Sequence, residues 1–377
     1  MHPDVVIVGA GITGSFAAYY LAGAGFRTAL VDRDGIGSHA SGVNPGGLNP
    51  LHGPGIPGPL GDLAMESFRL HEEAWEVLPE YSRTGFSPRI VFRIQLLRPG
   101  DDGREVGRVI DLYASATGFS AVRIDRRGLN GFVPGLHPDF TGGVLTYGNG
   151  CVEGRAYTKA VAEAALASGA ELVEGTIAGI EREGSRAVAV RFAEGGVLRC
   201  GAVVVSTGPW TDAARWLGVE IPVTPVKGQL LLVRVPGDLT YDLTRGLVGF
   251  YSLPGGHRAW LGGTEEHVGF DHVPDATGRE TLLRGAAGVL DRGELEVLDH
   301  VAALRPVTPD GLPIVGAAPG WENVFLATGA GRKGMLLSAG MARATADLVL
   351  EGSTSLPVGP CSPLRFRESA RVEDRVR

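Results

Sequence analysis

The sequence predicts an α/β fold in which a discontinuous Rossmann-like domain is combined with a β-rich second domain of α+β character. The first observation is a short apolar run, Val5 to Val8, followed at once by a glycine-rich turn and a helical pattern. The second is a later apolar run, Val203 to Val205, which ends in another turn and returns the chain to the same parallel sheet. The third is a set of strand-like segments that interrupts the first domain.

The glycine-rich turn has the spacing G-x-G-x-x-G, formed by Gly9, Gly11 and Gly14. In this motif the glycines allow a tight turn, a close approach of the backbone to a pyrophosphate, and tight packing of helix on strand. The phosphates are expected at the start of the helix, beside Ile12 and Thr13, because N–H groups are free there.

A second apolar run, Thr28 to Val31, ends in Asp32 and is followed by Arg33. A carboxylate about 20 residues after the first glycine is suited to accept hydrogen bonds from the adenosine ribose. The order of strand, glycine turn, helix, strand and acid therefore predicts a dinucleotide site.

The segment from Gly35 to Pro50 is rich in glycine, serine and proline. It is either an ordinary surface loop or a cofactor loop whose N–H groups and hydroxyls meet a pyrophosphate or a flat ring. We favour the cofactor loop, whose expected contacts are Ser41, Gly46, Gly47 and Leu48.

Composition indicates a globular protein of about two domains, with 377 residues, 44% hydrophobic and 20% charged. A net charge of −7 argues against nucleic acid or an anionic membrane as the main partner. No leader is recognisable before the first strand, and Arg343 and Asp347 interrupt the apolar stretch near the C-terminus, so a cytoplasmic protein is expected. Three cysteines and nine histidines show no metal-ligand spacing, and no metal is expected.

The intervening chain is expected to alternate between the two domains. Periodicity predicts helices at Leu63 to Leu78, Thr158 to Ser168 and Thr277 to Val289, and a charged hairpin at Asp101 to Gly103. The strand-like segments are Pro88 to Leu97, Gly143 to Tyr147, Glu171 to Val173, Gly175 to Glu183 followed by Arg186 to Phe192 as a β-meander, Val219 to Val235, Gly249 to Gly263 and Val324 to Ala327. The first domain is expected to comprise residues 1–85, 146–217 and 297–352, and the second 86–145 and 218–296, followed by a tail at 353–377.

Several motifs occur in an order that is typical of one group of flavoenzymes. They are Lys227-Gly228-Gln229, the run from Leu261 to Asp271, Leu304-Arg305-Pro306 with the segment Asp310 to Pro313, and the Thr328-Gly329 turn that leads into Arg332-Lys333-Gly334. With these motifs the chain resembles the glycine oxidase, sarcosine oxidase and D-amino-acid oxidase superfamily of FAD enzymes, and glycine oxidases in particular.

The resemblance implies a non-covalently bound FAD, a discontinuous nucleotide domain, and a second domain that covers the flavin and binds the substrate. It places Tyr251 and Arg305 at the substrate carboxylate, with Arg332 as a further candidate. Beside the residues already named, it implies cofactor contacts at Ile177, Thr207, Gly208, Trp210, Gly329, Gly331, Arg332, Lys333, Gly334 and Met335. The expected reaction oxidises the C–N bond of a small amino acid or N-substituted amino acid to an imine.

Two features depart from the family pattern. Ala330 follows the Thr-Gly turn, where glycine oxidases usually have histidine, and the segment Arg89 to Leu97 does not match the usual entry into the substrate domain. Three alternatives remain: a D-amino-acid dehydrogenase with an acceptor other than oxygen, a flavin module that trims a modified wobble uridine in transfer RNA, and a flavin-fold binding protein without turnover. The expected partner is a small carboxylate-bearing amine, with no membrane and no nucleic acid.

Overall fold

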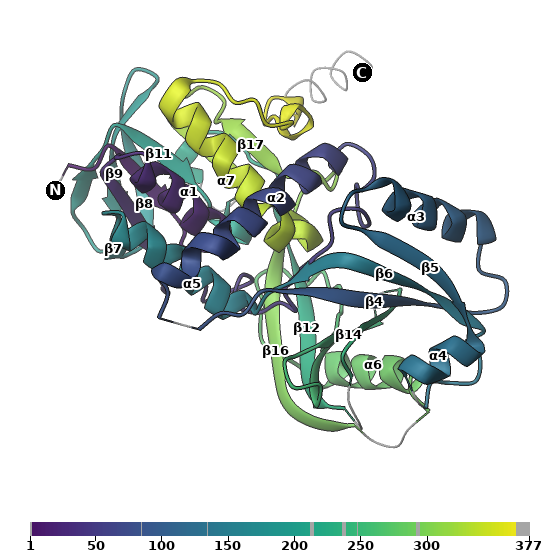
Figure 1. The fold of residues 1–377 in the computed structure, drawn as a ribbon. Helices are drawn as coiled ribbons and strands as arrows, with labels where there is room; N and C mark the ends of the chain where they lie inside the picture. Colours follow the sequence, from purple (N-terminus) through teal and green to yellow (C-terminus); the bar gives the residue numbers. More distant parts are fainter. Residues whose placement is uncertain are drawn as a thin grey trace, which may run out of the picture.

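A computed structural model describes residues 2–83, 85–133, 135–211, 215–235, 239–246, 248–291 and 295–366. Within these ranges the chain forms a six-stranded, mostly parallel sheet, a small three-stranded sheet and a nine-stranded sheet. Figure 1 shows the parallel sheet with its helices in one half of the molecule and most of the nine-stranded sheet in the other. The α/β class and the discontinuous first domain are as the sequence predicts.

The parallel sheet has the strand order β17-β18-β11-β1-β2-β7. Its strands are β1 (Val5–Val8), β2 (Thr28–Asp32), β7 (Glu171–Glu174), β11 (Ala202–Val205), β17 (Ile314–Ala317) and β18 (Val324–Thr328). Strand β11 pairs in parallel with β1, as expected for a chain that returns to the nucleotide domain, and only the edge strand β17 runs antiparallel.

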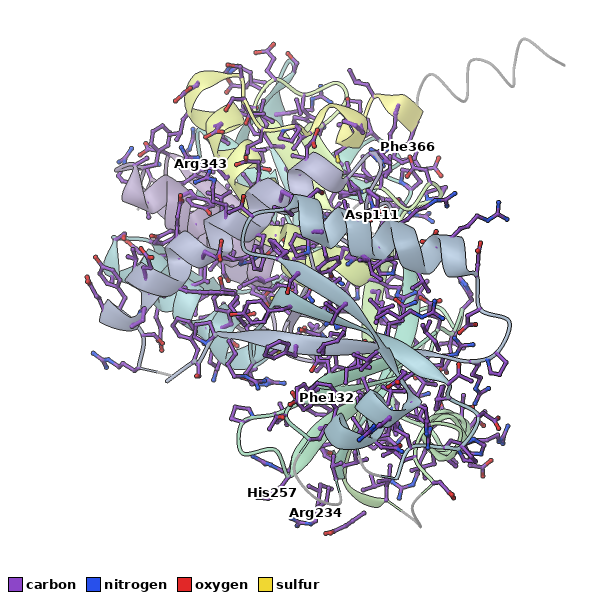
Figure 2. The ribbon with its side chains drawn as sticks, turned by 45° about the vertical axis from the view of Figure 1, so that its right-hand side comes forward. Asp111, Phe132, Arg234, His257, Arg343 and Phe366 are labelled. Atoms are coloured by element: carbon purple, nitrogen blue, oxygen red, sulfur yellow. The ribbon has the colours of Figure 1, made fainter. Side chains whose placement is uncertain are left out.

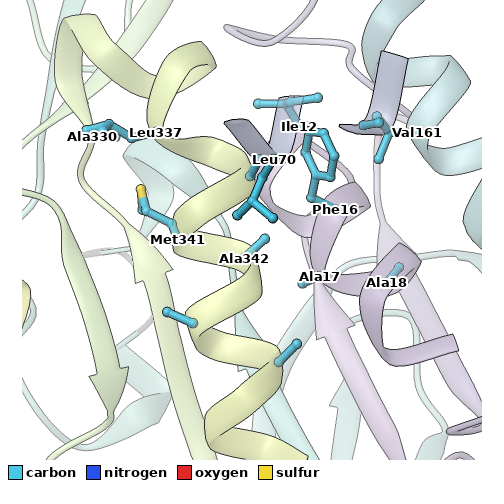
Figure 3. Packing of buried hydrophobic residues seen from close by; sticks show 14 of the residues in the cluster. Ile12, Phe16, Ala17, Ala18, Leu70, Val161, Ala330, Leu337, Met341 and Ala342 are labelled. Atoms are coloured by element: carbon cyan, nitrogen blue, oxygen red, sulfur yellow. The ribbon is translucent and has the colours of Figure 1, made fainter. Parts of the chain in front are cut away.

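Four helices cover one face of this sheet: α1 (Ile12–Gly23), α2 (Gly61–Val77), α5 (Gly154–Ala167) and α7 (Gly334–Glu351). Their shared core is made largely of small and branched side chains, so the helices approach one another closely. Figure 3 shows Phe16 of α1 beside Leu70 of α2, with Ala342 of α7 facing them.

The small sheet β10-β9-β8 comprises β8 (Ile177–Glu183), β9 (Arg186–Phe192) and β10 (Val197–Arg199). It packs Ala187 and Val190 against the other face of the parallel sheet. Short 3-10 helices occur at Leu78–Glu80, Gly208–Trp210, Arg215–Leu217, Gly331–Lys333 and Gly359–Cys361.

The large sheet has the order β16-β12-β15-β14-β13-β4-β6-β3, with β5 paired to β6. Its strands are β3 (Gly47–Leu48), β4 (Arg89–Leu97), β5 (Ser120–Asp125), β6 (Gly142–Cys151), β12 (Thr224–Arg234), β13 (Asp242–Arg245), β14 (Val248–Ser252), β15 (Arg258–Gly262) and β16 (Glu296–Val307). Helices α3 (Gly103–Ser115), α4 (Arg126–Phe132) and α6 (Ala276–Ala287) pack on it.

The expected charged hairpin at Asp101 to Gly103 is wrong. The Asp102 side chain accepts a hydrogen bond from the Arg104 N–H and begins helix α3. Aspartate is a strong helix N-cap because its carboxylate satisfies a free N–H of the first turn, and this signal outweighs the turn tendency of Asp-Gly.

The long strands β12 and β16 connect the two halves of the molecule (Figure 1). Figure 2 shows the extent of the fold: Arg234, at the end of β12, lies far from Arg343 of α7. Most of β16 falls within the stretch 297–352 that the sequence assigns to the first domain, yet it pairs with β12 along its length. The domain boundaries stay a prediction. Pro134 and the tail from residue 367 lie outside the described residues.

A buried histidine joins three of the helices. The His71 ring is 0% exposed, with Nδ1 2.8 Å from the Tyr157 hydroxyl and Nε2 2.9 Å from the Leu336 carbonyl oxygen and 3.0 Å from that of Met335. The carbonyls require a protonated Nε2, so Nδ1 of the neutral ring accepts from Tyr157. Burial lowers the pKa of His71 from 6.5 to about 4.

His71 should make the protein sensitive to mild acid. Between pH 6.5 and about 4 the unfolded histidine binds a proton and the folded one does not, so the free energy of unfolding falls as pH falls. The loss should approach about 3 kcal/mol. Urea unfolding from pH 8 to pH 4 should therefore show a steeper decline for wild type than for His71→Gln; parallel curves would contradict this role.

Candidate active site

A cavity of about 860 Å³ is lined by residues of both the parallel sheet and the large sheet. One end is lined by Asp32 and Ile177, and the other by Tyr251 and Arg305. Its size lies at the upper end of the range for cofactor and ligand sites. The sequence therefore predicted two ends of the same cavity from segments that are far apart in the chain.

The glycine turn is shaped by backbone contacts. Gly9 has φ +108°, and a Cβ at this position would lie 2.4 Å from the Ser206 carbonyl oxygen. A Cβ at Gly14 would lie 1.9 Å from the Gly9 carbonyl oxygen. Gly11 differs, because only the Ser41 hydroxyl would lie near its Cβ and its other side faces the cavity. Two glycines thus permit the turn and the third leaves backbone open to a ligand.

Asp32 lies at the end of β2 and lines the cavity. Its carboxylate accepts from the N–H of Ala10 at 2.7 Å, of Asp34 at 2.8 Å and of Gly35 at 2.9 Å. Three of about four acceptor positions are used, so the carboxylate both fixes the glycine turn and retains room for one ribose hydroxyl. Its neighbour Arg33 lies 4.6 Å from the centroid of the Trp210 ring.

Ser41 and the segment after it bring the loop against helix α1. The Ser41 hydroxyl accepts from the Ile12 N–H at 2.9 Å, so it caps the helix and leaves the neighbouring Thr13 to line the cavity. Gly46 has φ +77°, and Gly47 and Leu48 form strand β3, which pairs with β6.

Almost all of the expected site residues line this cavity. The exceptions are Gly14, which packs against the turn, and Leu48, which is fully buried beside Gly150. The others are Gly9, Gly11, Ile12, Thr13, Asp32, Arg33, Ser41, Gly46, Gly47, Ile177, Thr207, Gly208, Trp210, Tyr251, Arg305, Gly329, Gly331, Arg332, Lys333, Gly334 and Met335.

Arg305 is held across a bare stretch of backbone. A Cβ at Gly228, on the neighbouring strand β12, would lie 2.2 Å from Nη1 of Arg305. Nη1 donates a 2.8 Å hydrogen bond to the Thr264 carbonyl oxygen. Burial lowers the pKa of Arg305, and the nearby Glu265 opposes this shift. The guanidinium is thus fixed at the cavity wall with donors left for a ligand.

A polar network behind this wall explains the Lys227-Gly228-Gln229 motif. Lys227 is 1% exposed, and its ammonium lies 2.7 Å from Asp275 and 3.0 Å from Asp271. Burial alone lowers the pKa of Lys227, but the hydrogen bonds to Asp275 and Asp271 outweigh it and the net shift is upward. Lys227 therefore remains charged and does not reach the cavity.

Gln229, two residues along the same face of β12, completes the network. Its side-chain amide donates to Glu266 and Asp275, and its oxygen accepts from the Asp275 N–H. Its backbone N–H donates to the Thr264 hydroxyl, which donates in turn to Glu266. The network fixes the segment whose carbonyl receives Arg305.

Tyr251, Arg332 and Lys333 differ in how they are placed. The Tyr251 ring lies over Gly249, where a Cβ would be 2.9 Å from its edge. Arg332 lies 3.7 Å from Glu265. Lys333 donates to the carbonyl oxygens of Asn49 at 3.2 Å and His52 at 2.8 Å, so its first role is to tie that loop to the start of α7.

Sequence reasoning missed a second group of polar residues along the cavity: Arg93, Gln95, Thr244 and Arg245. They come from β4 and the neighbouring strand β13, which pair in parallel. The alternation of Arg93 and Gln95 on one strand face was the available signal, but no local pattern tells which face of β4 meets the cavity.

Comparison with known proteins decides the family. A family model described as "FAD dependent oxidoreductase" (DAO) matches residues 4–348. The chain belongs to the DAO family of FAD-dependent oxidoreductases. It is 30% identical over 378 residues to a glycine oxidase from Pseudomonas aeruginosa, covering 96% of this chain and 99% of that protein. It is also 30% identical to a D-amino acid dehydrogenase from Methylobacterium radiotolerans, covering 93% of this chain and 96% of that protein.

Solved structures agree with this assignment. The crystal structure of glycine oxidase from Geobacillus kaustophilus superposes with a TM-score of 0.87 at 27% identity, covering 96% of this chain and 98% of that one. The expected family and cofactor are confirmed. Among the described residues, no helix has the length and apolar character needed to cross a membrane, and no group of three or more potential ligands is placed to hold a metal ion.

The residues of this chain fit FAD. Gly11, Gly208 and Gly334 line the cavity, and a Cβ on Gly208 would meet nothing within 4 Å, so bare backbone is presented to a ligand there. Asp32 retains an acceptor position at the expected ribose end. The start of the 18-residue helix α7, with Arg332 and Lys333 beside it, gives positive potential at the opposite end.

The Gly14→Ala substitution should abolish FAD retention, because its Cβ would overlap the Gly9 carbonyl and shift the phosphate turn. Gly23→Ala is the matched control: Gly23 lies in the same helix, and its Cβ would meet nothing within 4 Å. The ratio of flavin to protein absorbance after purification should be near wild type for Gly23→Ala and near zero for Gly14→Ala. Equal flavin content in the two folded variants would contradict the role of Gly14.

We expect about one FAD per chain, held non-covalently. None of the cysteines at 151, 200 and 361 lines the cavity, whereas His39 and His52 do. Acid precipitation should release the yellow chromophore into the supernatant. A chromophore that stays with the pellet would instead indicate a covalent bond, with these two histidines as the first positions to test.

Proposed function

We propose that this chain oxidises the C–N bond of a small amino acid or N-substituted amino acid to an imine. The observation that carries the proposal is Arg305, fixed over Gly228 with unused donors at the end of the cavity opposite Asp32. A guanidinium in this state is suited to a carboxylate, which it can bind through two parallel hydrogen bonds. When bound, FAD supplies the hydride acceptor.

The protein's part is then to bind and orient the substrate. Arg305 binds the carboxylate and Tyr251 adds a hydroxyl, which together fix how the α-carbon is presented. The cations Arg305, Arg332 and Lys333 favour the neutral form of a substrate amine, which retains the lone pair that C–N oxidation requires. None of these steps needs a catalytic dyad.

The N-terminus of α7 makes a second electrostatic contribution, because it stabilises negative charge at the end of the cavity that it lines. Gly334 and Met335, its first residues, line the cavity, and Lys333 precedes them. The partial positive charge at a helix N-terminus stabilises negative charge that develops nearby. This contribution belongs to the backbone and does not depend on the residue at position 330.

The second candidate is a D-amino acid dehydrogenase that delivers electrons to an acceptor other than oxygen. Its support is the 30% identity to the Methylobacterium radiotolerans dehydrogenase, equal to that with the Pseudomonas aeruginosa glycine oxidase. Ala330 at the place where glycine oxidases usually have histidine is compatible with either.

An anaerobic screen tests the proposal and separates the candidates. Glycine, sarcosine and the D- and L-forms of small amino acids are added to the yellow protein, and loss of the flavin absorbance is followed. Air is then admitted. Rapid return of the absorbance supports an oxidase and persistent bleaching a dehydrogenase. Bleaching by NADH or NADPH, with none by any amino acid, would overturn the proposal.

Arg305→Ala should lower kcat/KM for the best acid substrate by roughly 30-fold to several thousand-fold. An unpaired carboxylate costs on the order of 2–5 kcal/mol, and ~1.4 kcal/mol corresponds to a factor of ten. Tyr251→Phe removes one neutral donor and should cost about tenfold. Stopped-flow reduction of the flavin gives both values.

A decarboxylated analogue serves as the control for these variants. It should be oxidised equally poorly by wild type and by Arg305→Ala, since neither reaction benefits from the guanidinium. If Arg305→Ala stays yellow and handles the acid substrate within threefold of wild type, the carboxylate is bound elsewhere.

A further inference from the structure

The proposed reaction leaves the guanidinium of Arg93 without a task. It lies on β4, the segment Arg89–Leu97 whose sequence departs from the family pattern, and it lines the same cavity as Tyr251 and Arg305. Its guanidinium carbon is 5.9 Å from the centroid of the Tyr251 ring, and a Cβ at Gly47 would be 3.2 Å from Nη2. Arg93 therefore lies beside Tyr251 and against the expected cofactor loop.

Arg93 is buried and mostly unsatisfied. Its side chain is 14% exposed, and Nη2 lies 3.2 Å from a carboxylate oxygen of Asp242, which is 0% exposed. The other Asp242 oxygen accepts from the N–H and hydroxyl of Ser252. Among the described residues, this ion pair gives the only hydrogen bond of the Arg93 side chain, and Nε is buried without a partner. Nε is enclosed by protein, but Arg93 lines the cavity and the remaining terminal N–H groups of its guanidinium are available to a ligand.

Arg245, on the neighbouring strand β13, differs from Arg93 because most of its guanidinium donors have hydrogen-bond partners within the protein. Arg245 donates to both carboxylate oxygens of Asp101, at 2.6 and 3.1 Å, and to the Leu96 carbonyl oxygen. Arg245 also lines the cavity, but its fork of donors is largely used within the protein. Arg93 is therefore the better candidate for binding a ligand.

The charges at this end of the cavity point the same way. Five cationic side chains line the cavity here, Arg93, Arg245, Arg305, Arg332 and Lys333, against Glu265 in the wall, Asp242 behind Arg93 and Asp101 paired with Arg245. Burial, with Arg93 and Arg332 nearby, lowers the pKa of Lys333 to about 7. The surplus is thus one to two positive charges at neutral pH, and an α-carboxylate offsets only one.

We propose that Arg93 binds a second carboxylate of the substrate. The preferred substrates are then amino acids that carry this second carboxylate on the side chain or on the nitrogen. This inference rests on the proposed function, since Arg305 must hold the first carboxylate. Arg93 lies 5.9 Å from the centroid of the Tyr251 ring, and Arg305 lines the same cavity as both. We expect one carboxylate of a diacid to bind Arg305 and the other to bind Arg93 within this cavity.

The test compares kcat/KM for anaerobic flavin reduction by matched pairs: D-aspartate with D-alanine, D-glutamate with D-norvaline, and N-(carboxymethyl)glycine with N-ethylglycine. A hydrogen bond to a charged group predicts a preference for the acid of roughly ten- to hundredfold in at least one pair. In Arg93→Met/Asp242→Asn, which removes both members of the ion pair and leaves no buried lone charge, this ratio should fall towards one. The matched control, Arg245→Met/Asp101→Asn, should keep the wild-type ratio.

Four results would overturn the inference. In wild type, equal rates within every pair would show that no second acid is read. A ratio that survives in the folded, yellow Arg93 double variant would assign the preference to other residues, and loss of FAD from that variant would place Arg93 against the cofactor. If no amino acid reduces the flavin at all, the proposed function fails, and the inference fails with it.

Binding to wild type gives a second measurement that does not depend on the variants folding. Succinate and malonate should perturb the flavin spectrum at concentrations at least tenfold below those needed for butyrate and propionate. Equal concentrations for the diacids and the monoacids would count against a second acid subsite.

Discussion

The Arg305 guanidinium packs directly on the backbone of Gly228, and this contact fixes the position of the group that is proposed to bind the substrate carboxylate. A side chain at position 228 would occupy the space of the guanidinium, and the Thr264 carbonyl that receives it is fixed by Gln229 and Glu266. In the Lys227-Gly228-Gln229 motif, Lys227 binds the carboxylates behind the cavity wall, Gly228 leaves space for the guanidinium, and Gln229 holds the Thr264 segment in place. Strands β12 and β16 pair along their length and extend from the nucleotide half into the large sheet. They therefore fix the position of Arg305 relative to the cofactor end of the cavity.

The nucleotide end follows a different logic, in which backbone contacts do most of the positioning. Gly9 and Gly14 admit carbonyl oxygens where any side chain would clash, and Asp32 receives three N–H groups of the same turn. Lys333 reaches back to two carbonyls of the loop that follows Gly47. The two ends thus share one cavity, but the first is held by main chain and the second by side-chain charge.

The parts of this architecture that depend on local chemistry were predictable. The glycine spacing, the acid after β2 and the buried runs at β1 and β11 are local sequence signals, and the family motifs pointed to Arg305 and Tyr251, which both line the cavity. The place of Arg93 in the cavity was not predictable, because it depends on contacts with Asp242 and Tyr251, which lie on other strands. Asp102 was misread because Asp-Gly serves both a hairpin and a helix start, and only the pairing of the following chain distinguishes them.

The most direct test of the account is the kinetic behaviour of Gly228→Ala beside the control Gly107→Ala, whose Cβ would meet nothing within 4 Å. The new Cβ at 228 would meet the far end of a flexible side chain, so the protein should fold, keep its FAD and displace Arg305. We predict that anaerobic flavin reduction by the best amino acid then loses at least tenfold in kcat/KM, with little change for its decarboxylated analogue. Wild-type kcat/KM for the amino acid in a yellow, folded Gly228→Ala would show that the position of Arg305 does not determine recognition of the carboxylate.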